Sequence, residues 1–265
     1  MHPIERLRYV ARASGVDPGM LVQEVAGALA GFASDPAALV TACRRMVDRH
    51  PASAPVWWLC ARMLCAGDPR REAWKAVEEM DADPTATELA HALPESSTIC
   101  VLGWPERVGV ALGRRGDVEV LVVDTLNEGS GFVRALERVD VEAIDVPLAG
   151  LGAAVADADL LVLDALAVSP SHCLAVAGSR AAAAVARHAD VPVWTVAGAG
   201  RLLPARLWDA LAARLEHRGE PWELDEDTVP LDLVDRMVGP VGPEPVVEGL
   251  RRTDCPIAPE LLREV

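Results

Sequence analysis

The chain has 265 residues, of which 51% are hydrophobic, and this is ample material for a folded core. Its formal net charge of −15 repels phosphate backbones, so we expect no direct contact with nucleic acid. No stretch approaches the roughly 20 uncharged apolar residues that span a membrane, and the N-terminus lacks a secretory signal, so we expect a cytoplasmic protein.

Metal and cofactor motifs are missing from the sequence. None of the six cysteines forms a Cys-x-x-Cys pair, and no two of the six histidines are four residues apart. Lys75 is the only lysine, which nearly excludes a Schiff-base lysine or a P-loop lysine. Gly129-Ser130-Gly131 lacks the last glycine of a dinucleotide-binding motif. We therefore expect neither a metal nor a cofactor.

The first third of the sequence predicts helices. An Asp side chain caps the first turn of a helix, and Pro fits the first helical position. An Asp-Pro dipeptide precedes each of four segments with helical periodicity: Asp17-Pro18, Asp35-Pro36, Asp68-Pro69 and Asp83-Pro84. The run Val56–Leu64 is apolar on nearly all sides and predicts a buried central helix. We expect residues 1–93 to form a helical domain that ends at the polar break Leu93–Ser97.

Beyond this break, short apolar runs alternate with helical segments, which predicts a parallel sheet with helices on both faces. The predicted strands are Thr98–Leu102, Val118–Val123, Val141–Val146, Leu160–Asp164 and Val191–Val196. The predicted helices are Pro105–Arg115, Gly131–Arg138, Leu151–Ala156, Ser179–His188 and Pro204–His217. The fold class is thus α/β, a helical N-terminal domain followed by a Rossmann-like domain over residues 97–265. We expect the tail from Pro221 to be an ordered wrap with helices at Leu231–Met237 and Pro259–Arg263.

Ligands of parallel α/β sheets bind at the carboxyl ends of the strands. Asp124, Asp145 and Asp164 end predicted strands, where a carboxylate serves either acid–base chemistry or the capping of a turn. Gly178-Ser179 precedes a predicted helix as its N-cap. Its amides either hold an anion or serve the helix alone, and the sequence leaves both readings open.

The ordered series of segments resembles the family of translation initiation factor 2B alpha, beta and delta subunits, which includes methylthioribose-1-phosphate and ribose-1,5-bisphosphate isomerases. Ser97–Trp104 is similar to the family's strand and turn I-L-T-H-G-Y-S, and Val120–Asp124 with Glu128-Gly129 is similar to its next strand and E-S-R-P-x-x-E-G loop. The other similar segments are Ala54–Leu64, Ala158–Leu163, Gly178-Ser179, Val191–Trp194 and Thr253–Leu262.

The chain departs from the isomerases at the positions that carry their chemistry. Gly103 stands where the isomerases have a catalytic cysteine, and Ala165 or Leu166 stands where they have an aspartate. Ala175-Val176 replaces an Asn-Lys pair that contacts substrate. Loss of the thiol, the acid and the pair that contacts substrate would remove both proton transfer and substrate positioning.

The resemblance and these departures imply a non-catalytic ligand-binding or regulatory protein, expected as a homodimer. We expect a pocket for a phosphorylated sugar or a nucleotide, lined by Gly103, Trp104, Glu128, Gly129, Gly178 and Ser179. One alternative is a sugar-phosphate isomerase with altered chemistry that acts through Asp145 or Asp164. Another is a partner-binding module in translation or another assembly, whose acidic surface suits basic partners.

Overall fold

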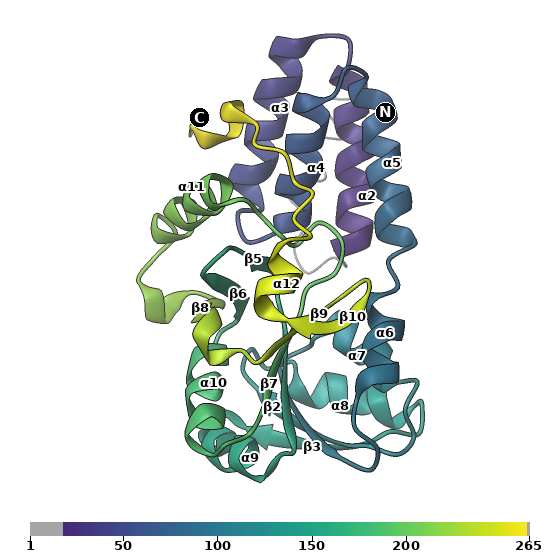
Figure 1. The fold of residues 1–265 in the computed structure, drawn as a ribbon. Helices are drawn as coiled ribbons and strands as arrows, with labels where there is room; N and C mark the ends of the chain where they lie inside the picture. The colour runs from purple at the N-terminus through teal and green to yellow at the C-terminus, as the bar shows by residue number, and fades with distance from the viewer. Residues whose placement is uncertain (1–17, 264–265) are drawn as a thin grey trace.

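The N-terminal part of the chain is a bundle of helices in a computed structural model that describes residues 18–263 (Figure 1). Its elements are α2 (Pro18–Leu29), the short 3-10 turn η1 (Ala30–Phe32), α3 (Pro36–Arg49), α4 (Ala54–Cys65) and α5 (Pro69–Asp81), whereas the next helix, α6 (Thr85–Ala92), packs against the sheet. Trp57 and Trp58 on α4 have no exposed surface. The expected central helix is therefore confirmed, and both indoles belong to the core.

Two of the Asp-Pro steps cap helices as predicted. The side chains of Asp35 and Asp68 accept hydrogen bonds from the amides of Ala38 at 3.0 Å and Arg71 at 3.1 Å. Asp83 differs in part: its Oδ1 accepts from the amide of Thr85 at the start of α6 at 3.0 Å, while its Oδ2 accepts from the amide of Ala199 at 2.8 Å. Asp17 lies outside the described residues.

A seven-stranded, mostly parallel sheet follows the helices; a parallel sheet was predicted, but its strands β9 and β10 were not. Its spatial order is β10-β9-β7-β4-β1-β2-β3, and every adjacent pair except β10–β9 is parallel. If the parallel strands alone are renumbered in chain order, their spatial order across the sheet, starting from β3, is 3-2-1-4-5-6. This is the order of a doubly wound sheet. The bounds are β1 Thr98–Leu102, β2 Glu119–Asp124, β3 Glu142–Pro147, β4 Leu160–Asp164, β7 Val193–Val196, β9 Arg236–Gly239 and β10 Gly242–Pro245.

Helices cover both faces of this sheet at its central strands, which are apolar on both sides. Ile99 and Val101 of β1 share one core with α6, α7 (Glu106–Leu112) and α8 (Gly129–Glu137). Cys100 and Leu102 of the same strand share the opposite core with α9 (Leu151–Asp157) and α10 (Ser179–His188). This alternation along β1 follows from the two-residue period of a strand.

The structure corrects the predicted C-terminal tail. Leu231–Met237 is not a helix: η4 (Leu231–Leu233) is a single 3-10 turn, and the chain then enters β9, which pairs with β7. Pro259–Leu262 (η5) is likewise a 3-10 turn. A second, antiparallel sheet forms from segments expected as loops and tail: β5 (Ala167–Val168), β6 (His172–Val176) and β8 (Glu226–Pro230). The remaining elements are α11 (Ala205–Glu216), η2 (Leu148–Gly150), η3 (Pro221–Glu223) and α12 (Val246–Leu250).

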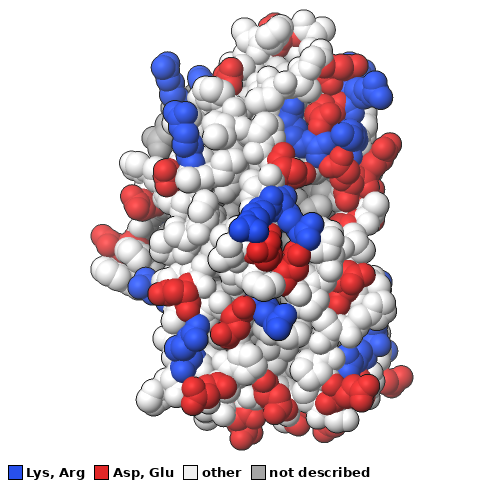
Figure 2. Space-filling view, in the orientation of Figure 1, with Lys and Arg blue, Asp and Glu red and all other residues white. Residues whose placement is uncertain are grey.

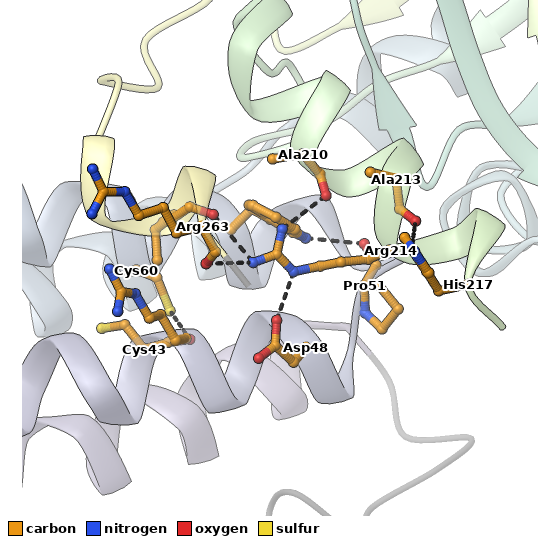
Figure 3. A network of polar contacts seen from close by, with 12 residues as sticks. Cys43, Asp48, Pro51, Cys60, Ala210, Ala213, Arg214, His217 and Arg263 are labelled. Atoms are coloured by element: carbon orange, nitrogen blue, oxygen red, sulfur yellow. Dashed lines mark hydrogen bonds and ion pairs between the residues drawn. The ribbon is translucent and has the colours of Figure 1, made fainter. Parts of the chain in front are cut away.

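Helix α11 and the C-terminal segment pack against the helical bundle rather than the sheet, although they follow the sheet in sequence (Figure 1). The nearly buried guanidinium of Arg214 on α11 joins the three parts (Figure 3). It donates to the Asp48 carboxylate of α3 at 2.6 Å and to the carbonyl of Arg263 at 3.1 Å, and it lies 4.8 Å from the Trp57 ring centre. Side-chain contacts thus fix the bundle to the second half of the chain.

Charged side chains on the face shown in Figure 2 are mixed in sign around α12. The Arg252 guanidinium lies 2.6 Å from the Glu244 carboxylate, and Arg251 lies 2.8 Å from Glu248. Acidic side chains predominate along the lower edge of this view. The charge around α12 is therefore largely paired.

Candidate functional site

A cavity of about 610 Å³ lies at the carboxyl ends of β1 and β4. These two strands flank the point where the parallel strand order reverses, which is the usual ligand position in such sheets. We call it the strand-end cavity, and its lining comprises Leu102, Trp104, Pro105, Glu106, Leu126, Glu128, Val162, Leu163, Asp164, Leu166, Val176, Ser179, Arg201, Asp225 and Glu226.

Asp164 and Arg201 form a buried ion pair in the wall of this cavity. The Arg201 guanidinium is 2% exposed, and its Nη1 lies 3.2 Å from Asp164 Oδ1 and donates to the carbonyl of Ala165. Burial lowers the pKa of Arg201, and the Asp164 carboxylate opposes this shift. The second Asp164 oxygen accepts from the amide of Arg107 at 3.0 Å. Arg201 Nε, also buried, has no hydrogen-bond partner among the described residues.

Further polar contacts connect this ion pair to the junction between the bundle and the sheet. The Arg107 guanidinium donates to Asp83, whose side chain is 1% exposed. The same Asp83 oxygen accepts from the amide of Ala199, in the loop after β7, at 2.8 Å. Acidic and basic side chains therefore alternate from the end of α5 to the cavity wall, in the order Asp83, Arg107, Asp164 and Arg201.

The N-terminus of α10 already faces a carboxylate. Gly178 adopts a left-handed backbone with φ of 92°, which a residue with a side chain rarely adopts, and precedes the helix. Asp227 Oδ2 on β8 accepts from the amides of Gly178 at 2.8 Å and Arg180 at 3.3 Å. The Ser179 hydroxyl is fully buried in the cavity lining and has no hydrogen-bond partner among residues 18–263.

The turn after β1 disfavours a side chain at Gly103. Its φ is 62°, and a Cβ there would lie 3.2 Å from the Thr125 hydroxyl. Among the described residues no cysteine lines the cavity. Cys100 and Cys173 lie within strands, and burial raises the pKa of each thiol to about 12.

The sequence-predicted site residues fall into two groups. Trp104, Glu128, Asp164 and Ser179 line the strand-end cavity. The glycines contribute backbone around it: Gly103 and Gly178 lie against Thr125, and Gly129 donates its amide to Asp124. Asp124 thus acts as a turn cap. Asp145 is an exposed residue of the edge strand β3 and does not line the cavity.

Sequence reasoning missed four charged residues of the lining: Glu106, Arg201, Asp225 and Glu226. Arg201 lies in the loop after β7, in which no site residue was predicted. Asp225 and Glu226 reach the cavity because β8 pairs with β6. Burial raises the pKa of Glu226, and Arg218, at 3.7 Å, opposes the rise.

Comparison with solved structures gives a consistent fold. The translation initiation factor eIF-2B of Pyrococcus horikoshii OT3 is similar with a TM-score of 0.77 and 15% identity, covering 94% of this chain and 98% of that one. The eIF2B beta subunit of Chaetomium thermophilum gives a TM-score of 0.72 and 16% identity over 99% of this chain and 93% of its own. The eIF2B delta subunit from A. fulgidus gives 0.60 and 15%, over 94% and 89%.

Sequence comparison adds nothing to this likeness, because neither a protein-family model nor a curated protein sequence matches the chain. The predicted resemblance is confirmed at the level of three-dimensional structure: the chain has the fold of the initiation factor 2B subunits.

Proposed function

We propose that this chain is a non-catalytic ligand-binding protein built on the initiation factor 2B fold. The observation that carries the proposal is the strand-end cavity, which lies where the parallel strand order reverses, the usual ligand position in such sheets. Its volume of about 610 Å³ falls in the range of small-molecule sites, roughly 300–1,000 Å³.

We propose that the protein is non-catalytic because of the residues at the two positions where the isomerases carry their reactive groups. At Gly103 the backbone and the nearby Thr125 hydroxyl disfavour a side chain. Asp164 is the nearest carboxylate to the isomerase acid, but it is the counter-ion of the buried Arg201. A carboxylate in that role is poorly placed to exchange protons with a substrate, because its protonation would leave the guanidinium unpaired.

We further propose that the protein works in the cytosol as a homodimer. One solved structure of similar fold is a tetrameric eIF2B-beta2-delta2 complex from C. thermophilum, with a TM-score of 0.71 and 17% identity, over 92% of this chain and 90% of its own. The edge strand β3 leaves Ile144 46% exposed, and Leu148, directly after it, is 52% exposed. Light scattering on the purified protein would test the dimer; a monomer mass at high concentration would refute it. Among residues 18–263 no helix is long and apolar enough to cross a membrane.

The ligand-binding proposal is tested by thermal-shift screening and calorimetry. The resemblance implies sugar phosphates and nucleotides, so the panel begins with these and extends to neutral sugars and amines. Binding should disappear in Leu126→Trp, which places an indole in the cavity from a half-buried loop position. The matched control Val247→Trp lies on α12, where the side chain is 63% exposed, and should bind as the wild type does. A panel in which nothing binds would refute the proposal.

A further inference from the structure

A second cavity, of about 270 Å³, lies beside the β9–β10 hairpin. Its walls come from four segments: the loop after β7, the hairpin, helix α12 and the start of the C-terminal segment. The hairpin and α12 lie at the base of the helical bundle (Figure 1). This hairpin cavity shares no lining residue with the strand-end cavity, so it is a separate site.

The loop after β7 forms one wall of the hairpin cavity with backbone alone at two positions, Gly198 and Gly200. A Cβ on Gly198 would collide with Asp83 Oδ2. Gly200 has a φ of 74°, and a Cβ there would lie 3.0 Å from the Trp58 ring. Packing against the bundle therefore fixes the position of this wall.

Arg252 is held at the hairpin cavity by a carboxylate and keeps donors free. Its Nε and Nη2 donate to the two Glu244 oxygens at 2.6 Å and 2.7 Å. Its Nη1 has no hydrogen-bond partner among residues 18–263. The side chain is 49% exposed, so a ligand can reach it. A guanidinium fixed along one edge presents its other edge to a second carboxylate.

Asp254 lines the same cavity and is also held from one side. Its Oδ1 accepts from the Trp58 indole Nε1 at 3.1 Å. Its Oδ2 accepts no hydrogen bond and forms no ion pair within the described part of the chain. The residue is exposed, so this oxygen is available to a cationic group of a ligand.

The uncharged part of the lining is apolar and small. Val241 is 53% exposed and Leu202 is half-buried, so both offer apolar surface to a ligand. The volume of about 270 Å³ lies below the roughly 300–1,000 Å³ of drug-sized ligand sites. The cavity thus suits a small molecule that carries one carboxylate, one amine and a short apolar group.

We infer that the hairpin cavity binds a free α-amino acid with a small apolar side chain. The α-carboxylate accepts from Arg252 Nη1, the α-ammonium donates to Asp254 Oδ2, and the side chain lies against Leu202 and Val241. This site is additional to the ligand site proposed at the strand ends.

The test compares three probes that share one carbon skeleton: L-valine, isovalerate, which lacks the amine, and isobutylamine, which lacks the carboxylate. Each is titrated calorimetrically into the full-length protein at neutral pH and low ionic strength. L-Alanine and L-leucine are titrated as well, to vary the length of the side chain. We expect at least one of the three amino acids to bind, and isovalerate and isobutylamine to bind roughly fivefold more weakly than L-valine or not at all, because each loses one partly exposed charge pair.

Variants of the two charged residues test how the amino acid is held. Arg252→Gln and Asp254→Asn should each weaken binding by roughly fivefold. Asp254→Asn keeps an oxygen that can accept from Trp58, so it tests the inference even if Arg252→Gln unfolds. The controls are Arg251→Gln, at a 69% exposed side chain paired with Glu248, and the exposed Asp209→Asn on α11. Neither control residue lines the cavity, and both variants should bind as the wild type does.

Two bulky substitutions locate the binding. Val241→Trp fills the hairpin cavity and should abolish it, whereas Leu126→Trp, in the strand-end cavity, should leave it unchanged. Loss of binding in Leu126→Trp alone would place the amino acid at the strand ends, which overturns this inference while the proposed function stands. Absence of binding by all three amino acids, equal binding of L-valine and its two analogues, or unchanged binding in Asp254→Asn would also overturn it.

Discussion

The Asp227 carboxylate lies 2.8 Å from the amide of Gly178, at the start of helix α10. Helix N-termini attract anions because their first amides have no partners within the helix. Here the chain supplies that anion itself, from strand β8 of the small antiparallel sheet. An external phosphate would have to displace Asp227 to reach these amides.

Replacing Asp227 should therefore change both stability and anion binding. Asp227→Ala should lower the free energy of unfolding by about 1–2 kcal/mol, the usual effect of losing a carboxylate at a helix start. Inorganic phosphate should then stabilise the variant but not the wild type. Urea unfolding with and without phosphate measures both effects, with the exposed Asp232→Ala as control. Equal stabilisation of the wild type by phosphate would contradict this account.

Restoring the thiol position of the isomerases should cost stability without yielding activity. Gly103→Cys forces a side chain onto a φ of 62° and places its Cβ 3.2 Å from the Thr125 hydroxyl. We expect a loss of about 1–3 kcal/mol, typical of a strained backbone position. Gly116→Cys is the matched control, because no atom lies within 4 Å of a Cβ there. Thermal unfolding compares the two, and equal melting temperatures would show that Gly103 is not constrained.

Arg214 should be essential for joining the bundle to the C-terminal segment. Arg214→Met keeps much of the side-chain volume but leaves Asp48 and the carbonyls of Leu261 and Arg263 without their donor. Breaking a buried ion pair from one side costs about 3–5 kcal/mol. The exposed Arg206→Met on the same helix controls for the loss of charge. Denaturant unfolding of the two variants provides the measurement, and a loss of less than 1 kcal/mol in Arg214→Met would refute this role, since surface pairs contribute that little.

The buried Glu226 makes stability depend on pH in a predictable direction. Burial raises its pKa above the ordinary 4.5, so the folded state binds this proton more tightly than the unfolded chain does. The stability contributed by protonated Glu226 is present below 4.5 and is lost as the pH rises through the raised pKa. Glu226→Gln resembles the protonated side chain and should match the wild type in acid but exceed it at neutral pH. A difference between the two proteins that does not grow with pH would count against this assignment.

Much of the doubly wound sheet could be predicted because its signals are local. The apolar runs at Thr98–Leu102 and Leu160–Asp164 coincide with β1 and β4, and Ser179–His188 coincides with α10. Each run is bounded by turn residues and short enough to be a strand. The strand ends then indicated Trp104 and Asp164 as cavity residues without any knowledge of distant contacts.

The rest depends on pairing between distant segments. Leu231, Val234 and Met237 have a helix-like spacing, but Met237 pairs with Thr195 of β7 and joins the sheet. Likewise β6 is complete only when β8, about fifty residues later, lies beside it. Asp225 and Glu226 enter the cavity lining through that pairing, so the acidic character of the site could not be predicted from local sequence.

The central claim, a ligand site without isomerase chemistry, is tested most directly by following turnover. Proton NMR of methylthioribose 1-phosphate and of ribose 1,5-bisphosphate, each incubated with a near-stoichiometric amount of protein, would detect conversion of aldose to ketose even if it were slow. We predict unchanged spectra over the life of the sample. Appearance of the ketose signals, and their loss in Asp164→Asn, would contradict the account.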